Sequence, residues 1–474
     1  MFLLTISVSG FASNIYFPAL STIADNLNVS VELVNLTVTS YLIFQGLAPS
    51  LWGPISDRKG RRIAYIFSLV LFFGACVGLA QTKNYATLIV LRCLQSSGSA
   101  STISIGSGVI GDITTGSNRG GYMGVSQAGL LAPVAVGPII GGAISQSLGW
   151  RAIFWFLSIY SGSVLLLLIF ILPESLRSII GDCSRLPSNI FIKYPLCWYL
   201  RRNNTQLIGH YTPAPKEGID IFGPLNILIS REAAPIIIFL AVYYAVWQMS
   251  ITSMSTLFQD RYGLSETEVG LTFIANGVGS IVGTLITGKI LDTDYSRVSA
   301  KYLSSLNDLE SNNTIEGSTE TKSNGFPLEK ARLRLVPIFS FSQCLAIIIF
   351  GWSIEYPDRI PIAIPIVCTF VTGWTAISTL SLIMTYLIDV FPDRSAAASA
   401  SINLARCFFA AGGTSFIMPL VNSIGAGPAF TICMAIQVLA LVGPFIQWKY
   451  AARWRREVAE RESTGCTNKI SNKS

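Results

Sequence analysis

Apolar residues along the chain come in unbroken blocks of about 20, not at amphipathic spacing and not in short alternating runs. A block of that length lets a helix cross a bilayer, whereas a membrane barrel would need short alternating strands. The pattern therefore predicts an all-α membrane protein with about twelve transmembrane helices. We place them near residues 1–21, 33–52, 63–81, 85–112, 120–145, 150–172, 233–257, 268–291, 335–352, 361–389, 396–420 and 428–447.

Lysine and arginine in the short connections favour one side of this bundle. That side carries Arg58, Lys59, Arg61, Arg62, Arg119, Arg394 and the tail residues Lys449, Arg453, Arg455 and Arg456. The opposite side has Lys83, Arg151, Arg261 and Arg359. By the positive-inside rule the first side is cytoplasmic, and an even number of helices places both ends of the chain there. The net charge of +7 follows from this bias, so nucleic-acid binding is not expected.

The predicted helices fall into two groups of six that echo each other. A glycine and an aspartate four residues apart end the second and eighth helices, and an aspartate ends the fourth and tenth. These residues are Gly53, Asp57, Gly288, Asp292, Asp112 and Asp389. Two halves related by an axis along the membrane normal would place a substrate site between them near mid-membrane.

We accordingly divide the chain into an N-terminal half (1–172), a cytoplasmic central loop (173–232), a C-terminal half (233–447) and a cytoplasmic tail (448–474). A polar stretch after the eighth helix has too few apolar residues to pack, so we expect a disordered cytoplasmic loop near 293–334.

Few residues suit metal, redox or nucleophilic chemistry. The nine cysteines are scattered without paired spacing, and His210, the single histidine, falls in the central loop. We expect no cofactor, no metal and no enzyme activity. The first apolar block has no basic region ahead of it and no small-residue cleavage site after it, so a signal peptide is not expected either.

The connection between the second and third helices concentrates charge where the chain leaves the bilayer. It contains Gly53, Asp57, Arg58, Lys59, Gly60, Arg61 and Arg62. Gly53 would let its helix approach a neighbour closely, and Asp57 would pair with a nearby arginine or face the N-terminal dipole of the helix at 396–420. Together they would latch the cytoplasmic side closed. The alternative is that the basic residues only set topology.

This connection resembles the loop 2–3 signature of the major facilitator superfamily, a glycine, an aspartate four residues on, then Arg-x-Gly-Arg-Arg. Residues 92–98 resemble the superfamily's span 4 signature, and residues 137–142 resemble its span 5 antiporter signature. Within the superfamily's twelve-span drug:proton antiporters, the fungal multidrug-resistance branch is resembled by four further segments: 172–177, 288–292, 329–334 and 403–407. The chain departs from that pattern in lacking a cytoplasmic N-terminal tail. The resemblance implies two pseudo-symmetric six-helix halves and proton-coupled export.

Charged residues inside the predicted helices are functional candidates, because an uncompensated charge in the bilayer is costly. The resemblance implies a part in proton transfer for Arg92, with Asp112 as a second coupling candidate; the alternative for Arg92 is a structural arginine bonded to the backbone or to Gln95. Asn403 and Arg406, in the second half, are likewise candidates for either a functional or a structural role. The remaining acids, Asp57, Asp112, Asp292 and Asp389, all lie near cytoplasmic ends, and none lies near mid-membrane.

Gly137, Pro138, Gly141 and Gly142 form a small-residue stretch with one missing backbone donor, so their helix can pack tightly and bend there. In the antiporters it resembles, this segment blocks leak through the closed protein. Ordinary small-residue packing is the alternative.

A cavity for a lipophilic amine or aromatic compound needs aromatic faces and a few hydrogen-bonding groups. The candidates are Tyr16, Tyr41, Gln45, Tyr243, Tyr244, Trp247, Gln248, Asn276 and Trp374. We expect a monomeric plasma-membrane antiporter that exchanges protons for drug-like, lipophilic or cationic compounds. An uncoupled facilitator would suit the missing central carboxylate, and a transporter-like receptor is a third, weaker alternative.

Overall fold

The computed structural model describes residues 2–113, 119–175, 223–311, 328–391, 395–451 and 453–454, and in these every regular element is a helix. The N-terminal half contains α1 (Phe2–Asn14), η1 (Phe17–Ala19), α2 (Leu20–Leu27), α3 (Val31–Lys59), α4 (Arg61–Ala80), α5 (Tyr85–Ile113), α6 (Arg119–Leu148) and α7 (Arg151–Ile171). The C-terminal half contains α10 (Gly223–Ile229), α11 (Ala234–Tyr262), α12 (Glu266–Ser311), α14 (Leu328–Arg332), α15 (Val336–Glu355), α16 (Ala363–Val390), α17 (Ser395–Ile424) and α18 (Ala426–Ala440), followed by helical residues 442–451.

The predicted transmembrane helices are confirmed. Eleven segments within the described residues are long and apolar enough to cross a bilayer. α5 is the twelfth expected helix, and its 29 residues correspond to roughly 43 Å of helix. Arg92, Gln95 and a serine-rich stretch after them keep the hydropathy of α5 below that of the others.

The first membrane segment is broken, which corrects the single helix expected over 1–21. α1 ends at Asn14, Tyr16 precedes the short η1, and α2 continues to a left-handed Asn28 at φ 51°. Pro18 has no N–H to donate, so an uninterrupted hydrogen-bond ladder cannot pass through it. The break puts η1 and α2 at the outer end of the bundle, the end away from residues 53–62.

Two predicted loops begin or end differently from expectation. α12 continues as one helix to Ser311, so no loop begins near residue 293. α10 occupies part of the predicted central loop and packs on α17, where Ser401 Oγ donates to the Pro224 carbonyl at 2.6 Å. Residues 176–222, 312–327 and 455–474 lie outside the described residues; they hold most of the predicted central loop, the middle of the predicted 293–334 loop and most of the tail.

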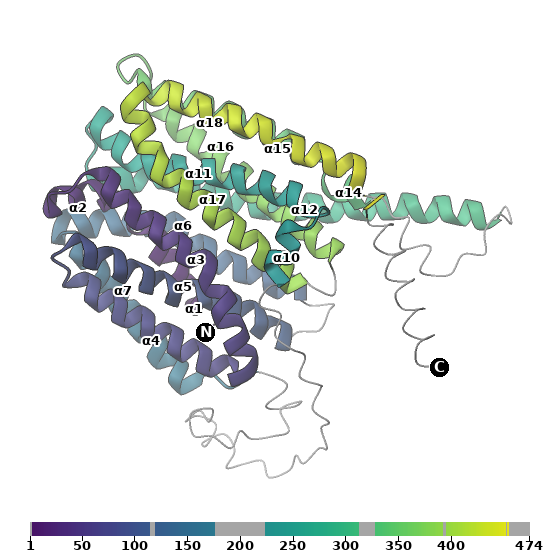
Figure 1. Ribbon diagram of the computed structural model, residues 1–474, viewed down its shortest axis with the longest axis horizontal. Coiled ribbons are helices and arrows are strands. Elements are labelled where there is room, and N and C mark those ends of the chain that lie inside the picture. Colours follow the sequence, from purple (N-terminus) through teal and green to yellow (C-terminus); the bar gives the residue numbers. More distant parts are fainter. Residues whose placement is uncertain are drawn as a thin grey trace, which may run out of the picture.

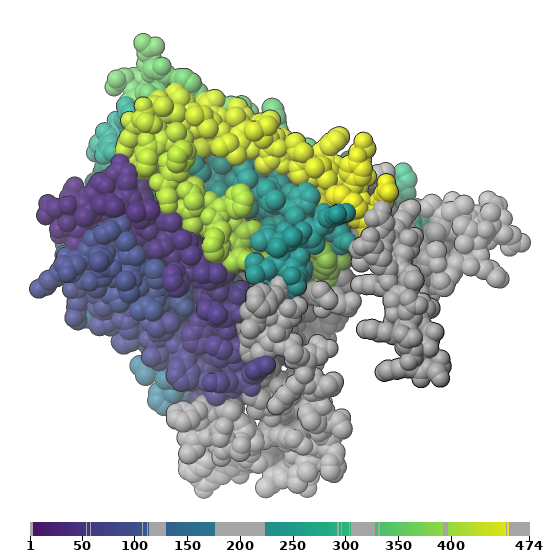
Figure 2. Space-filling model, in the orientation of Figure 1, coloured from purple at the N-terminus to yellow at the C-terminus, as the bar shows by residue number. Residues whose placement is uncertain are grey.

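The two halves lie side by side, the first in purple and blue and the second in teal to yellow (Figures 1 and 2). They meet along two helix pairs, α3 with α17 and α6 with α12. At the first pair an added Cβ on Gly46 would lie 3.0 Å from Cys407 Cβ, so the helices are close near the middle of α3. The substrate site predicted between the halves would lie at this seam.

Candidate functional site

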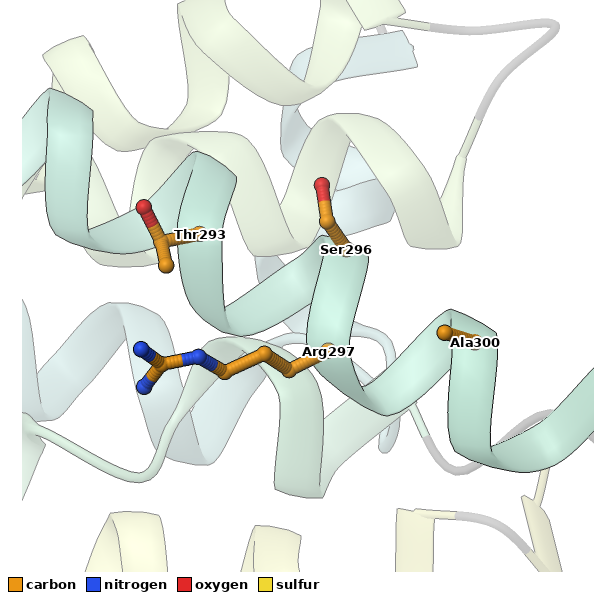
Figure 3. Close-up of a pocket in the computed structure, with 4 residues that line it drawn as sticks. All are labelled: Thr293, Ser296, Arg297 and Ala300. Carbon is orange, nitrogen blue, oxygen red and sulfur yellow. The ribbon is translucent and has the colours of Figure 1, made fainter.

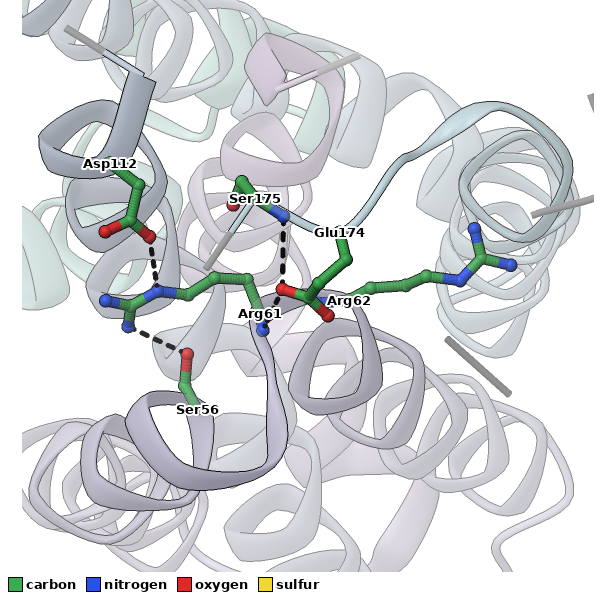
Figure 4. A network of polar contacts seen from close by, with 6 residues as sticks. All are labelled: Ser56, Arg61, Arg62, Asp112, Glu174 and Ser175. Carbon is green, nitrogen blue, oxygen red and sulfur yellow. Dashed lines mark hydrogen bonds and ion pairs between the residues drawn. The ribbon is translucent and has the colours of Figure 1, made fainter. Parts of the chain in front are cut away.

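A carboxylate from the end of the first half caps the N-terminal end of α4. The chain turns between α3 and α4 at Gly60, whose φ of 109° suits glycine. Glu174 then accepts hydrogen bonds from the backbone N–H groups of Arg61 at 2.8 Å and Arg62 at 3.2 Å (Figure 4). An acid on the first N–H groups of a helix satisfies unpaired donors and complements the helix dipole.

Arg62 provides the reverse contact on α7. Its guanidinium donates to the carbonyls of Ile169, at 2.7 Å, and Leu172, at the C-terminal end of α7. The side chain is buried, and a cation there complements the negative end of that helix. α4 and α7 are therefore joined by two charged caps of opposite sign, one of which, Glu174, had no role assigned to it from the sequence.

Arg61 reaches the end of α5. Its Nε lies 2.9 Å from Asp112 Oδ2, and Nη1 donates to Ser56 Oγ at 2.9 Å (Figure 4). Gly108 makes room, because a Cβ there would lie 2.6 Å from the guanidinium carbon. In the second half Arg332 Nε pairs with Asp389 Oδ2 at 2.8 Å, so the two aspartates of the sequence echo occupy matching places.

The structure gives less support to the latch predicted around Gly53 than to the contacts of Arg61 and Arg62. A Cβ on Gly53 would meet nothing within 4 Å, and the same is true of Gly288, so neither glycine permits a close helix contact among the described residues. The described residues therefore give no support to close packing at Gly53, and the latch stays a prediction. Arg58 is exposed, and the side chains of Asp57 and Asp292 lie outside the described set.

Arg92 is enclosed by aromatic rings. Only 1% of it is exposed, and its guanidinium carbon lies 4.1 Å from the centre of the Tyr16 ring and 4.5 Å from that of Tyr41. Its Nη1 donates to Gln95 Oε1 at 2.7 Å, while Nε has no partner. The two tyrosine hydroxyls bond to Thr37 and Ser99, partners that carried no signal in the sequence. The charge is thus held by neutral groups.

The glycine stretch of α6 contacts both halves. A Cβ on Gly141 would lie 2.1 Å from the Ile15 carbonyl oxygen, and one on Gly142 would lie 2.3 Å from that of Glu266. Gly270 of α12 has its nearest backbone neighbour at Pro138, 2.5 Å from an added Cβ. Gly137 has looser contacts of 3.5 Å or more. The stretch therefore packs α6 against the break in the first span and against α12.

Several candidates for a substrate cavity come together around Arg406 at the seam between the halves. Arg406 Nε and Nη2 donate to Asn403 Oδ1 at 3.1 and 2.9 Å, and Asn403 Nδ2 donates across the seam to the Gln45 carbonyl at 3.2 Å. The Tyr244 ring lies 4.9 Å from the guanidinium carbon.

The contacts continue into α11 and α12. Tyr244 packs edge-on against Trp247 at 5.3 Å between ring centres, and Trp247 Nε1 donates to Asn276 Oδ1 at 3.0 Å. We call Gln45, Tyr244, Trp247, Asn276, Asn403 and Arg406 the seam cluster. Tyr16 and Tyr41 belong with Arg92 instead.

The other three cavity candidates lie elsewhere or are less constrained. Tyr243 is fully buried on the far side of α11, against Phe239 and Cys344, so it is not part of the cluster. Gln248 is buried one turn after Tyr244. Trp374 packs on Gly283 of α12, and its Nε1 is buried without a partner.

A surface hollow of about 480 Å³ lies well away from these residues. Thr293, Ser296, Arg297 and Ala300 line it along one face of the C-terminal part of α12 (Figure 3). It is open and formed by a single helix, so it has no bearing on a central site. Among the described residues no group of three His, Cys, Asp or Glu could hold a metal.

Among the described residues, eleven helices that can cross a membrane and the long helix α5 form two halves with polar residues gathered at the seam, which is the arrangement of a multi-pass membrane transporter. The chain belongs to the Major Facilitator Superfamily, whose family model matches residues 2–307. The resemblance in the motifs is thereby confirmed.

Known relatives and structures agree with this assignment. Citrate exporter 1 of Aspergillus niger is 34% identical over 456 residues, covering 94% of this chain and 84% of that protein. The antiporter QDR2 of Candida albicans is 34% identical over 435 residues, covering 91% and 84%. A crystal structure of a D-xylose–proton symporter superposes with a TM-score of 0.63 at 16% identity, covering 95% and 96% of the two chains, which supports the fold alone.

Proposed function

We propose that the protein is a monomeric, proton-coupled antiporter of the plasma membrane that exports small organic molecules by alternating access. In such a cycle the two halves rock about a central site and expose it to each side in turn. The family assignment supports transport itself. Similarity to relatives named as antiporter and exporter supports the direction of transport.

The observation that carries the proposal is how the halves meet at the outer end. Ser255 Oγ of α11 donates to the Phe17 carbonyl at 2.6 Å, and Gln259 Nε2 donates to that of Pro18 at 3.3 Å. The rings of Phe17 and Phe273 stack at 6.0 Å. These contacts close the outer side above the seam cluster, and they are hydrogen bonds and ring contacts that a rocking motion can break and remake.

Proton coupling rests on weaker support. The residues proposed to take part are Arg92, held between two tyrosines, and Asp112, paired with Arg61 next to the capped end of α4. A proton on Asp112 would weaken its ion pair and loosen α5 from α4, which links a charge change to a helix contact.

An uncoupled facilitator is the second candidate, and one observation favours it. In the described helices no carboxylate lies near the middle of the bilayer, where many proton-driven transporters place one. In that case transport would only equilibrate the substrate across the membrane.

The deciding experiment is uptake by proteoliposomes that contain the purified protein. Lipophilic cations, weak organic acids and polyamines are offered with and without an imposed pH gradient. Accumulation above equilibrium only with the gradient would establish antiport. Equilibration at the same rate in both conditions would refute proton coupling and favour the facilitator.

A further inference from the structure

We propose that the seam cluster binds the carboxylate group of a small organic anion, with Arg406 as the residue that receives it. The inference rests on the proposed transport function and narrows its substrate class. It also departs from the expectation of cationic substrates, since a cation would find no carboxylate at this depth among the described residues.

The first argument is the balance of charge. Arg92 and Arg406 are the cationic side chains within the membrane-crossing parts of α5 and α17, and each is surrounded by tyrosine, glutamine or asparagine. A buried charge with neutral partners only is unfavourable unless something of opposite sign joins it. An anionic substrate would provide that charge each time it binds.

The second argument is proximity. Arg92 stacks on Tyr41, and Asn403, the partner of Arg406, bonds to the Gln45 carbonyl. Tyr41 and Gln45 are one turn apart on α3, roughly 6 Å along the helix. The Arg92 side of this turn of α3 faces the first half, and the Arg406 side faces the second half. The positive potentials of the two guanidinium groups therefore add at the seam.

The third argument is the geometry of free donors. Arg406 directs Nε and Nη2 to a single acceptor, Asn403 Oδ1. Among the described residues its Nη1 has no hydrogen-bond partner, and the residue is only partly buried. The edge formed by Nη1 and Nη2 can donate to the two oxygens of a carboxylate side by side, the arrangement for which arginine is best suited. Arg92, with 1% exposure, acts at a distance and is not a direct ligand.

Tyr244 completes the site. Its ring contacts both the Arg406 guanidinium and the Trp247 ring, and these contacts fix the plane of the guanidinium group. An aromatic wall next to a cationic fork suits an organic acid with a carbon skeleton better than a bare inorganic anion.

The test measures binding to the purified full chain by isothermal titration with citrate, succinate and benzoate, and with tetraphenylphosphonium as the cation. At least one carboxylate is expected to bind. Arg406→Gln should weaken that binding about 10- to 100-fold, the loss typical of a charge-assisted pair. Arg261→Gln, which removes an exposed arginine at the outer end of α11, should leave it unchanged.

A second variant guards against a folding defect in Arg406→Gln. Asn403→Asp keeps the size of the side chain and puts a carboxylate next to Nε and Nη2 of Arg406, so it should neutralise the guanidinium charge and weaken binding of the substrate carboxylate to a similar extent. If Asn403→Asp binds carboxylates as the parent does, the site assignment is wrong.

The outcomes separate this inference from the proposed function. Gradient-driven transport of the cation, together with no carboxylate binding up to about 10 mM, would keep the antiporter and overturn the anion site. Carboxylate binding that depends on Arg406, without gradient-driven accumulation, would keep the anion site and overturn proton coupling.

Discussion

At the scale of single residues, Arg92 shows how the bundle holds a charge away from water. The side chain lies against two rings, Tyr16 from the break in the first span and Tyr41 from α3, and it is bonded to Gln95 on its own helix. Its planar, delocalised cation suits this environment better than a compact ammonium would. The bond to Gln95 is the contact that a purely structural role for Arg92 would need. A functional measurement distinguishes that role from a part in proton transfer.

Arg92→Ala should abolish gradient-driven accumulation, because it removes the charge and leaves Gln95 Oε1 buried without its donor. Arg92→Lys keeps the charge and should retain part of the activity. The matched control is Arg151→Ala: Arg151 also stacks on a ring, that of Trp150 at 4.3 Å, and donates to the Thr82 carbonyl, but at the outer end. Full accumulation by Arg92→Ala in proteoliposomes would return Arg92 to a structural role.

The sequence was informative about individual residues where chemistry is rare. Arg92, Arg406 and Asn403 stand out because charged and amide side chains are costly in a bilayer, and the structure places the latter two in contact. Tyr243 and Tyr244 could not be told apart, since adjacent aromatic residues point to different faces of a helix and the sequence does not say which face is the seam. Glu174 was overlooked because its partners are backbone N–H groups, which leave no mark in the sequence.

At the scale of helices, the two charged caps of Glu174 and Arg62 connect α4 to α7. We call this connection the α4–α7 joint. Glu174→Gln should lower the free energy of unfolding by about 1 kcal/mol, since the charge on the α4 N-terminus is lost while one acceptor remains. It should also slow transport, because the joint borders the Arg61–Asp112 pair. Thermal unfolding in detergent and initial transport rates measure the two effects.

Glu355→Gln is the control for this prediction. Glu355 caps α18 in the same manner, accepting from the N–H groups of Ala426 at 2.6 Å and Gly427 at 3.2 Å, but at the outer end within one half. We expect the same loss of stability with no change in transport rate. Equal slowing by both variants would mean that the α4 cap matters only for stability.

Gly142 tests the contact between α6 and α12. Gly142→Ala would place a methyl group 2.3 Å from the Glu266 carbonyl oxygen, so the two helices must move apart at the outer end. The outer side should then open more often. A cysteine introduced at Ser255, which is fully buried, should react several-fold faster with a membrane-impermeant thiol reagent.

The control for that variant is Gly74→Ala in α4, where an added Cβ meets nothing within 4 Å. It should leave the labelling rate of the Ser255 cysteine unchanged. Unaltered labelling in Gly142→Ala would show that the close contact does not hold the outer side closed.

Helix positions could be predicted from the sequence to within a few residues, because hydrophobic length is set by the bilayer itself. The exceptions have local causes. Pro18 interrupts the first span. α12 continues to Ser311 because the polar residues after its apolar part are also compatible with a helix. The open space around Gly53 could not be predicted from the sequence, since close approach of its helix to a neighbour depends on how the two halves are tilted.

At the scale of the whole molecule, the outer contacts should govern transport reversibly. Ser21 Oγ donates to Gln259 Oε1 across the halves, so the double variant Ser21→Cys with Gln259→Cys should be cross-linked by a short bifunctional thiol reagent that forms a reducible disulfide at each cysteine. Cross-linked protein should neither accumulate nor release substrate, because the outer side cannot open, and reduction should restore the parent rate. Each single variant, treated with the same reagent, serves as the control. Transport that continues after complete cross-linking would contradict alternating access across this seam.

The unbroken course of α12 has a mechanical consequence. Its outer part packs on α6 while its cytoplasmic part extends beyond the bilayer as the same rigid rod, visible as the projecting helix in Figure 1. Any tilt of the second half is therefore magnified at the tip, and a rotation of about 10° would swing an end that protrudes roughly 30 Å by about 5 Å. A spin label on Ser304, which is exposed, would report that swing by electron paramagnetic resonance distance measurements as substrate is added. α12 is in this sense a built-in lever arm, through which a shift at the seam becomes a displacement in the cytoplasm.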